Sequence, residues 1–251
     1  MALLEAEQLR KRFGGVAAVD GVSFAVAAGE RVALIGPNGA GKSTCFNLVG
    51  GQLAPDEGHV RLHGHEVTGT PPRGLFRLGV GRTFQVAAAF ASMSVVENVQ
   101  LALLSRAGRA FGALARAVTA FRAEARALLL RTGLDALADR PCGQLAYGDV
   151  KRLDLALALA NQPRLLLMDE PTAGMAPAER HALMALVSAI ARESGLAVLF
   201  TEHDMDVVFG HADRILVLDR GRLIAAGDAA TVRADPEVKR LYLGEAAEGP
   251  S

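Results

Sequence analysis

The segment from Gly36 to Thr44, which reads GPNGAGKST, has the residue types and spacing of a phosphate-binding loop. Its glycines allow the backbone to approach an anion closely, and the amides at the start of the following helix would point at that anion. Lys42 would add a positive charge for the β- and γ-phosphates, and the Ser43 hydroxyl would be available to Mg²⁺. The motif predicts a nucleoside-triphosphate site but does not separate kinases, GTPases and motor ATPases. The residues of this predicted site are Gly36, Pro37, Asn38, Gly39, Ala40, Gly41, Lys42, Ser43 and Thr44.

Short apolar runs in the sequence predict the strands that would position this loop. Val32–Ile35 precedes the loop, and similar runs occur at Leu165–Met168, Ala197–Phe200 and Ile215–Leu218. Continuous apolar runs suit strands that are buried on both faces, as in a parallel sheet covered by helices. Three β-type segments near the N-terminus, separated by glycine-containing turns, predict a further set of strands around Leu3–Leu9, Val22–Val26 and Val60–His63. We therefore expect an α/β fold.

The middle of the chain is predicted to be helical. Apolar residues recur at steps of three and four, the spacing of one helix face, at Phe111, Leu114, Val118, Phe121, Ala125 and Leu128. Arginines mostly fill the other positions, at Arg109, Arg116, Arg122 and Arg126. They form either a solvated helix face, which is the usual case, or a surface for anionic lipid or a partner. A second helix is expected over Val150–Ala160, which is rich in Ala, Leu and Arg.

Composition excludes several classes of protein. The chain has 251 residues, of which 51% are hydrophobic and 22% charged, and this predicts a globular protein with a sizeable core. The 27 basic and 27 acidic residues balance, so nucleic acid is not an expected partner. Cys45 and Cys142 form no CxxC pair, which favours a reducing compartment without disulfides or metal thiolates. Glu5 and Glu7 do not fit a signal peptide, and no apolar run is long enough to span a bilayer.

Five further segments, met in chain order, match one family of nucleotide-dependent motors. They are Arg12-Phe-Gly-Gly15, Arg82-Thr-Phe-Gln85, Leu145-Ala-Tyr-Gly-Asp149, Leu165-Leu-Leu-Met-Asp-Glu170 and Phe200-Thr-Glu-His-Asp204. With them, the chain resembles the ABC (ATP-binding cassette) ATPase subunits over nearly its whole length. The resemblance implies a RecA-like P-loop NTPase fold, with a mostly parallel sheet core, an N-terminal antiparallel β subdomain and a helical subdomain. It also implies one domain, 1–251, in which about 86–160 is the helical subdomain with the signature segment, and about 1–85 and 161–251 form the rest.

The resemblance also assigns roles to single residues. Phe13 would stack on adenine, and Gln85 would contact Mg²⁺ and the attacking water. A buried strand would deliver Asp169 to its carboxyl end, beside the phosphates, to hold Mg²⁺ through water, and Glu170 would orient and polarise the attacking water. His203 would contact the γ-phosphate. The expected cofactors are therefore ATP and Mg²⁺, with Ser43, Gln85 and Asp169 as the metal site.

The segment matching the family signature departs from its common form, L-S-G-G-Q. Leu145 and Gly148 are kept, whereas Ala146, Tyr147 and Asp149 differ. A helix that begins here would still present amides to a phosphate on the opposite subunit. The missing serine hydroxyl removes one hydrogen bond, worth about 0.5–1.5 kcal/mol. In a nearby loop the family usually has an aspartate, and this chain has Ala176, so communication between two ATP sites is expected to differ.

These departures resemble one subfamily, the ATPases of branched-chain amino acid uptake. The segments that carry this resemblance are Gly81–Gln85, Leu145–Gly148, Ala173–Met175 and Val238–Gly244. Urea- or amide-uptake ATPases and the ATPase of lipopolysaccharide export share parts of the pattern. The resemblance implies integral-membrane permease subunits as partners, a second ABC ATPase chain that is identical or different, and indirectly a periplasmic solute-binding protein. The chain would then be a peripheral protein at the cytoplasmic face of the inner membrane.

Two other functions compete with transport. A soluble ABC ATPase acting on ribosomes, DNA or iron–sulfur assembly is disfavoured by the single cassette, the lack of a long coiled-coil insertion and the zero net charge. A regulatory module that binds nucleotide without hydrolysis is disfavoured because Glu170, Gln85 and His203 are all present.

Overall fold

The computed structural model describes residues 2–83, 89–107 and 121–244. In these residues the larger sheet has six strands in the order β10-β9-β3-β8-β7-β6. All neighbouring pairs are parallel except β9 and β10, which are antiparallel. The expected mostly parallel sheet is therefore confirmed. Its strands are β3 (Arg31–Ile35), β6 (Val80–Arg82), β7 (Leu165–Asp169), β8 (Ala197–Thr201), β9 (Arg214–Asp219) and β10 (Arg222–Gly227).

A second sheet is formed by the N-terminal part of the chain. It is antiparallel, with the order β2-β1-β4-β5, and confirms the β-type segments expected there. Its strands are β1 (Ala2–Phe13), β2 (Val16–Ala27), β4 (Glu57–Leu62) and β5 (His65–Glu66). β1 and β2 run well past their apolar centres because a tight turn joins them and their backbones stay paired to Phe13 and Val16.

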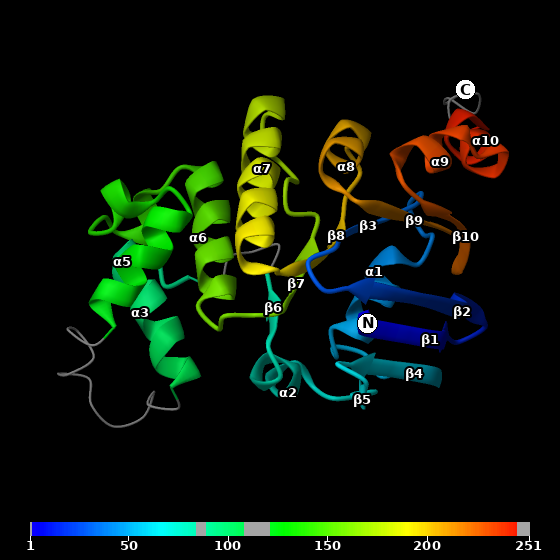
Figure 1. Ribbon diagram of the computed structural model, residues 1–251, viewed down its shortest axis with the longest axis horizontal. Coiled ribbons are helices and arrows are strands. Elements are labelled where there is room, and N and C mark those ends of the chain that lie inside the picture. Colours follow the sequence, from blue (N-terminus) through cyan, green and yellow to red (C-terminus); the bar gives the residue numbers. More distant parts are fainter. Residues whose placement is uncertain (1, 84–88, 108–120, 245–251) are drawn as a thin grey trace.

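The alternation of side chains along the central strands divides the core into two clusters, one on each face of the larger sheet. Leu166 and Met168 point to one cluster, and Leu165 and Leu167 point to the other. The first cluster is covered by α6, α7 and α8, and the second by α1 and the antiparallel sheet (Figure 1). The central strands are buried on both faces, which is why they read as continuous apolar runs.

The helices of the described residues fall into groups that are visible in Figure 1. α1 (Lys42–Val49) follows β3, and α2 (Pro72–Arg77) precedes β6. α3 (Val95–Arg106), α5 (Arg122–Arg131) and α6 (Tyr147–Leu159) lie together at the end of the molecule farthest from the antiparallel sheet. α7 (Pro177–Ser194) and α8 (Met205–His211) cover the sheet, and α9 (Ala229–Ala234) and α10 (Pro236–Gly244) lie beside β10. Two short 3₁₀ turns, Asp135–Leu137 and Cys142–Gln144, connect α5 to α6.

The predicted middle helix differs from the structure in where it begins. Phe121 has a left-handed backbone (φ 59°) and is the residue before α5, so the helix begins at Arg122 rather than continuing through Phe121. Ala125 and Leu128 are buried as the spacing predicted, while Phe111, Leu114 and Val118 lie outside the described residues. Arg122 and Arg126 both pair with Asp139, at 2.6 Å, so this face is a network of surface ion pairs. Arg109 and Arg116 also lie outside the described residues.

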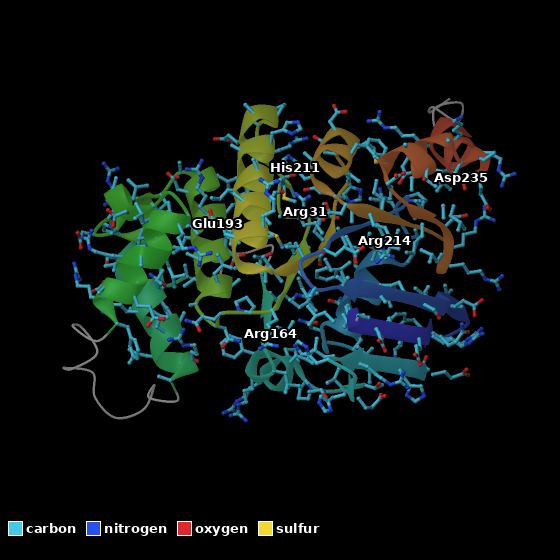
Figure 2. The ribbon with its side chains drawn as sticks, viewed as in Figure 1. Arg31, Arg164, Glu193, His211, Arg214 and Asp235 are labelled. Carbon is cyan, nitrogen blue, oxygen red and sulfur yellow. The ribbon has the colours of Figure 1, made fainter. Side chains whose placement is uncertain are left out.

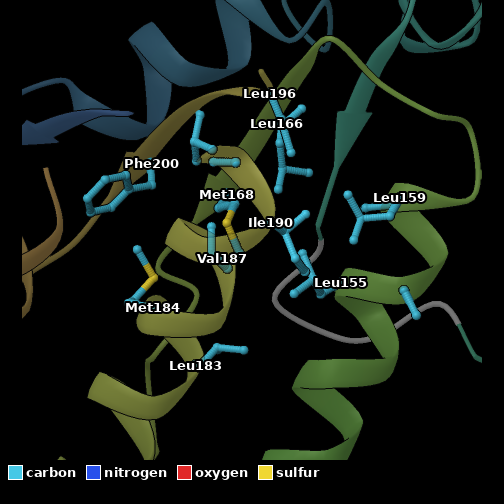
Figure 3. Close-up of a cluster of buried hydrophobic side chains, with 14 of the residues drawn as sticks. Leu155, Leu159, Leu166, Met168, Leu183, Met184, Val187, Ile190, Leu196 and Phe200 are labelled. Carbon is cyan, nitrogen blue, oxygen red and sulfur yellow. The ribbon is translucent and has the colours of Figure 1, made fainter. Parts of the chain in front are cut away.

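The helix expected over Val150–Ala160 is confirmed as α6, which begins three residues earlier, at Tyr147, and ends at Leu159. Figure 3 shows Leu155 and Leu159 of α6 directed toward Ile190 of α7 and Leu166 of β7. α6 therefore packs into the same apolar cluster as the central sheet, and this fixes the position of its N-terminus.

Ion pairs hold the sheet at the edge where β3 and β9 begin. Arg31 binds Asp213, and Arg214 donates to Glu30 Oε1 at 2.7 Å and to the Ala25 carbonyl at 2.6 Å. Figure 2 labels Arg31 and Arg214, which lie near one another on these paired strands. Within the described parts of the chain, no helix is both long and apolar enough to cross a membrane.

Candidate nucleotide-binding and catalytic site

The carboxyl ends of three neighbouring strands lie side by side and position the predicted site. Leu34 on β3 pairs with Thr201 on β8, and Thr201 pairs with Asp169 on β7. Because parallel strands end at one edge of a sheet, the three segments that follow them must also meet there. These segments are the glycine-rich loop after β3, Glu170 after β7 and His203 after β8.

The glycine-rich loop fits closely against the rest of the chain at two of its glycines. Gly36 has φ 152° and Gly41 has φ 99°, a region that favours glycine. A Cβ on Gly36 would lie 2.2 Å from the carbonyl oxygen of Leu218, and one on Gly41 would lie 2.2 Å from that of Ala18. Side chains are therefore excluded at both positions, and the loop is held between β9 and β2.

Lys42 begins α1 and is buried, with only 6% of its surface exposed. Its Nζ donates to the carbonyls of Gly36, at 2.6 Å, and Pro37, at 2.9 Å, so the ammonium lies inside the curve of the loop. The N-cap residue, Gly41, offers no side chain to cap the first amides of α1. A cation at a helix start whose first amides have no side-chain cap is an arrangement suited to binding phosphate groups.

Two carboxylates stand at the end of β7 and share Thr201 as a neighbour. The Thr201 hydroxyl donates to Asp169 Oδ1 at 2.7 Å and accepts from the backbone amide of Glu170 at 3.0 Å. Glu170 has a left-handed backbone, with φ 47°, which turns its side chain away from the strand direction. Glu170 Oε1 lies 2.6 Å from His203 Nε2. An ionised carboxylate only accepts hydrogen bonds, so Nε2 of His203 is the donor when this contact is a hydrogen bond.

Two other side chains in the site were not singled out from the sequence. Arg82, at the end of β6, places Nη2 3.8 Å from Asp169 Oδ2 and 2.9 Å from Asn47 Oδ1 of α1. Burial lowers the pKa of the Arg82 guanidinium, and the charge of Asp169 opposes that shift. Glu202 is buried beside His203 and accepts hydrogen bonds from Thr172 and His203. Their only sequence signal is their position within the Arg82–Gln85 and Phe200–Asp204 segments.

The aromatic residue expected at adenine lies at the end of the β1–β2 hairpin. Phe13 closes β1, pairs with Val16, and is 50% exposed. The approach of Gly41 to Ala18 places the glycine-rich loop against β2, a few residues from this hairpin end. Phe13 is thus available on the antiparallel sheet beside the loop, with a free ring surface for stacking. Gln85 lies outside the described residues.

The signature-like segment forms the start of α6. Ala146 is the N-cap residue and contributes no capping hydrogen bond, and Tyr147 is half exposed. The Tyr147 hydroxyl donates to the Ala173 carbonyl at 2.9 Å, which joins this segment to the loop before α7. Leu145, Gly148 and Asp149 are partly buried. In Figure 1, the start of α6 lies on the other side of β7 and α7 from α1. The segment therefore does not meet the glycine-rich loop of its own chain.

The residues expected to hold Mg²⁺ fit that ion chemically. Ser43 is exposed in the first turn of α1, and Asp169 is directed to the same edge of the sheet. Hydroxyl and carboxylate oxygens are the ligands that Mg²⁺ prefers, with water and phosphate oxygens completing the shell. Among the residues that the structure describes, Asp169 Oδ1 accepts from the Thr201 hydroxyl, so the carboxylate retains lone pairs for a metal-bound water.

The sequence matches family models over most of its length. The model described as "ABC transporter" matches residues 19–173, and the model described as "Branched-chain amino acid ATP-binding cassette transporter" matches residues 222–248. The chain is 39% identical to the high-affinity branched-chain amino acid transport ATP-binding protein BraF of Pseudomonas aeruginosa, covering 97% of this chain and 98% of BraF. The identity and coverage are the same for LivG of Escherichia coli, a high-affinity branched-chain amino acid transport ATP-binding protein.

Solved structures resemble the chain over nearly its full length as well. The ADP conformation of MJ1267, an ATP-binding cassette of an ABC transporter, superposes with a TM-score of 0.85 at 32% identity, covering 97% of this chain and 99% of MJ1267. The dimeric, post-hydrolysis structure of the cassette MJ0796 with ADP and Pi superposes with a TM-score of 0.75 at 27% identity, covering 90% of this chain and 98% of that one.

Proposed function

Because this chain belongs to the ATP-binding cassette family of ABC transporters, we propose that it binds ATP with Mg²⁺ at the ends of β3, β7 and β8 and powers import through a separate permease. Members of this family are ATPases, and one neighbouring solved cassette, MJ0796, is bound to ADP and Pi. One observation carries the catalytic assignment above all others. Glu170 Oε1 lies 2.6 Å from His203 Nε2, at the edge of the sheet where the glycine-rich loop also begins.

In the proposed reaction, water attacks the γ-phosphorus of ATP, and the bond between that phosphorus and the β–γ bridging oxygen breaks. ADP leaves, and the proton of the water passes by way of the solvent-exposed edge to inorganic phosphate or solvent. Glu170 accepts a hydrogen bond from the attacking water and orients it, and His203 contacts Glu170 through Nε2 beside the proposed position of the γ-phosphate. Lys42 neutralises charge on the β- and γ-phosphates. Mg²⁺, when bound through Ser43, Gln85 and Asp169, would neutralise further charge there.

The site is proposed to be completed by a second ATPase chain. The start of α6 is exposed and is separated from α1 of its own chain by β7 and α7 (Figure 1). A second chain facing this one would place its own signature segment over the γ-phosphate, with the amides of the helix start directed at the anion. The proposal includes the division of the domain into a helical subdomain, about 86–160, and the remainder, about 1–85 and 161–251. The helical subdomain carries the signature segment that would contact the partner's ATP.

A groove lined by residues of α2, β6, α3 and α6 is the proposed docking place for the permease. It has a volume of about 400 Å³, and its wall includes Leu75, Phe76, Phe90, Leu101 and Leu157. Arg82 and Phe90, which also line it, come just before and just after the segment that contains Gln85. An apolar cytoplasmic segment of the permease would fit this wall and would touch the residues that flank Gln85. The chain would then act as a peripheral protein on the cytoplasmic face of the inner membrane.

Branched-chain amino acids are the proposed solutes. The relatives BraF and LivG are named for their transport, and the matching C-terminal model covers β10, α9 and α10. Urea or amide import and lipopolysaccharide export remain as alternatives from the motif pattern. The proposed partners follow from the same assignment: permease subunits, a second ATPase chain and, through the permease, a periplasmic solute-binding protein.

The catalytic assignment is tested with Glu170→Gln. The neutral amide is a weaker acceptor than the carboxylate and orients the attacking water less well, so phosphate release should fall at least about 100-fold while ATP binding is kept. The measurements are phosphate release and equilibrium binding of a fluorescent ATP analogue. Glu193→Gln, on the exposed last turn of α7, is the matched control and should behave as wild type. A wild-type rate in Glu170→Gln would show that another group orients the water.

A further inference from the structure

The buried carboxylate of Glu202 connects the two chain segments that carry the proposed catalytic pair. Only 4% of its surface is exposed. Its Oε1 accepts from the Thr172 amide at 3.1 Å and from the Thr172 hydroxyl. Its Oε2 accepts from the amides of His203, at 3.0 Å, and Asp204, at 3.4 Å. Each oxygen thus serves a different segment, one after β7 and one after β8.

This arrangement requires an acceptor with two equivalent ends. An ionised carboxylate offers two oxygens and no donor, so it can satisfy four donors that converge from both sides. A buried carboxylate without such partners would be strongly unfavourable, and its four donors account for its burial. A hydrophobic residue here would leave the amides of Thr172, His203 and Asp204 without this acceptor.

We propose that Glu202 is a positioning residue for ATP hydrolysis, which sets the distance between the side chains of Glu170 and His203. Thr172 is two residues after Glu170, and His203 directly follows Glu202, so the carboxylate fixes both backbones within a few bonds of the catalytic pair. The left-handed backbone of Glu170 is a conformation that must be held by its surroundings. The inference rests on the proposed function, since it concerns the geometry of the same reaction.

A second connection between the same two segments allows the role of Glu202 to be tested in a folded protein. Arg180 donates through Nη1 to Asp204 Oδ2 at 2.7 Å and through Nε to the Met175 carbonyl at 2.8 Å. On the segment after β7, Arg180 contacts Met175, which is farther from Glu170 in the sequence than Thr172, the residue that Glu202 contacts. Loss of Glu202 should therefore loosen the catalytic pair while the two segments stay attached.

The main variant is Glu202→Gln. One end of the glutamine side chain is an NH2 donor, and it would face either the donors of Thr172 or the backbone amides of His203 and Asp204. Two donors cannot bond to each other, so the segment that faces the NH2 group must move away. Because small misplacements of catalytic groups are costly, we expect kcat to fall by about 10- to 100-fold, with the KM for ATP changed by no more than about threefold. Thr172→Ser keeps the hydroxyl and should retain kcat near wild type. Thr172→Val removes it and should lower kcat to an intermediate value.

Two controls separate positioning from a loss of stability. Leu4→Val, in the buried part of β1, should lower the midpoint of thermal unfolding but leave kcat unchanged at temperatures well below it. In a His203→Ala background, Glu202→Gln should lower the residual kcat by less than about threefold. The contact between the side chains of Glu170 and His203, which Glu202 is proposed to position, is already absent in that background. All variants are assayed as the full chain with ATP and Mg²⁺, at one protein concentration at which the wild type hydrolyses measurably.

The outcomes are distinct. A fall in kcat for Glu202→Gln that largely disappears in the His203→Ala background supports the inference. An unchanged kcat, or the same fold loss in both backgrounds, overturns it even though the wild type is an ATPase. Absence of hydrolysis by the wild type would instead refute the proposed function, and the inference with it.

Discussion

At the scale of the residue, the candidate site depends on a few polar contacts that cross between strands. Thr201 serves Asp169 and Glu170 at once, with one hydroxyl that donates to the first side chain and accepts from the amide of the second. This hydroxyl fixes both acids at the end of β7. Asp169 is left directed toward the proposed metal position, and the left-handed turn at Glu170 directs its carboxylate to His203. The two neighbouring acids therefore face different partners because of backbone geometry rather than residue type, and this supports the separate roles proposed for them.

Lys42 gives a prediction about binding. Its ammonium is held by two loop carbonyls inside the curve of the glycine-rich loop, where it would meet the phosphates. Lys42→Ala removes a charge that interacts directly with the phosphates, and we expect the dissociation constant for ATP to rise at least about 10-fold, with hydrolysis lost as a consequence.

The measurement is a titration with a fluorescent ATP analogue in the presence of Mg²⁺. Lys239→Ala, on the exposed side of α10, is the control and should bind as the wild type does. Equal affinities for Lys42→Ala and wild type would remove Lys42 from the nucleotide site.

At the scale of the element, the helices differ in how they begin. α3 has a complete capping box, in which the Ser94 and Glu97 side chains exchange hydrogen bonds with backbone amides. α6 and α7 instead have Ala146 and Ala176 as their N-cap residues, and alanine has no side-chain acceptor. At α7 the Glu179 carboxylate still accepts from the Ala176 amide at 3.3 Å, which is half of a capping box. Of these two starts, that of α6 is the segment proposed to reach the partner ATPase.

Ala146→Ser is predicted to stabilise the start of α6. A serine at the N-cap position can accept a hydrogen bond from an amide of the first turn, and this cap is worth about 0.5–2 kcal/mol. We expect the free energy of unfolding, measured by urea denaturation, to rise within that range. Ala185→Ser, on the exposed middle of α7, is the control. It should not raise the free energy of unfolding, because serine has a lower helix propensity than alanine. A decrease for Ala146→Ser would mean that the N-cap geometry does not accept a hydroxyl.

At the scale of the whole molecule, the functional groups are divided between two regions. The glycine-rich loop, Asp169, Glu170 and His203 gather at the edge of the central sheet, whereas the start of α6 lies on the far side of β7 and α7 (Figure 1). A single chain is therefore proposed to hold one half of a site and to supply the other half of a partner's site. The dimeric cassette with ADP and Pi among the structural neighbours is an example of two such chains together.

This division predicts that hydrolysis depends on protein concentration. If two chains must meet to complete a site, the specific activity of the purified chain should be low when dilute and should rise with concentration over the range in which dimers form. The test is to measure phosphate release per milligram of protein over a hundredfold range of dilutions. Light scattering on the same samples reports where dimers form. A high specific activity that does not change with dilution would show that one chain is sufficient.

The sequence alone determined the elements and most of the candidate residues. The apolar runs predicted β3, β7, β8 and β9, because strands buried on both faces need continuous apolar residues. The glycine-rich motif predicted the loop before α1, because closely approaching backbone demands glycine at fixed spacing. These are properties of neighbouring residues, so they can be read along the chain.

Only the tertiary structure decided how those residues meet. The sequence contained no periodic signal that Thr172 and Glu202, 30 positions apart, share a buried hydrogen bond, or that Arg82 lies 3.8 Å from Asp169. Nor did the helical spacing reveal that α5 begins only after Phe121, whose backbone is left-handed. Contacts of this kind depend on the order in which strands are placed in the sheet, and that order is fixed by the packing of the whole chain rather than by the residues beside each strand.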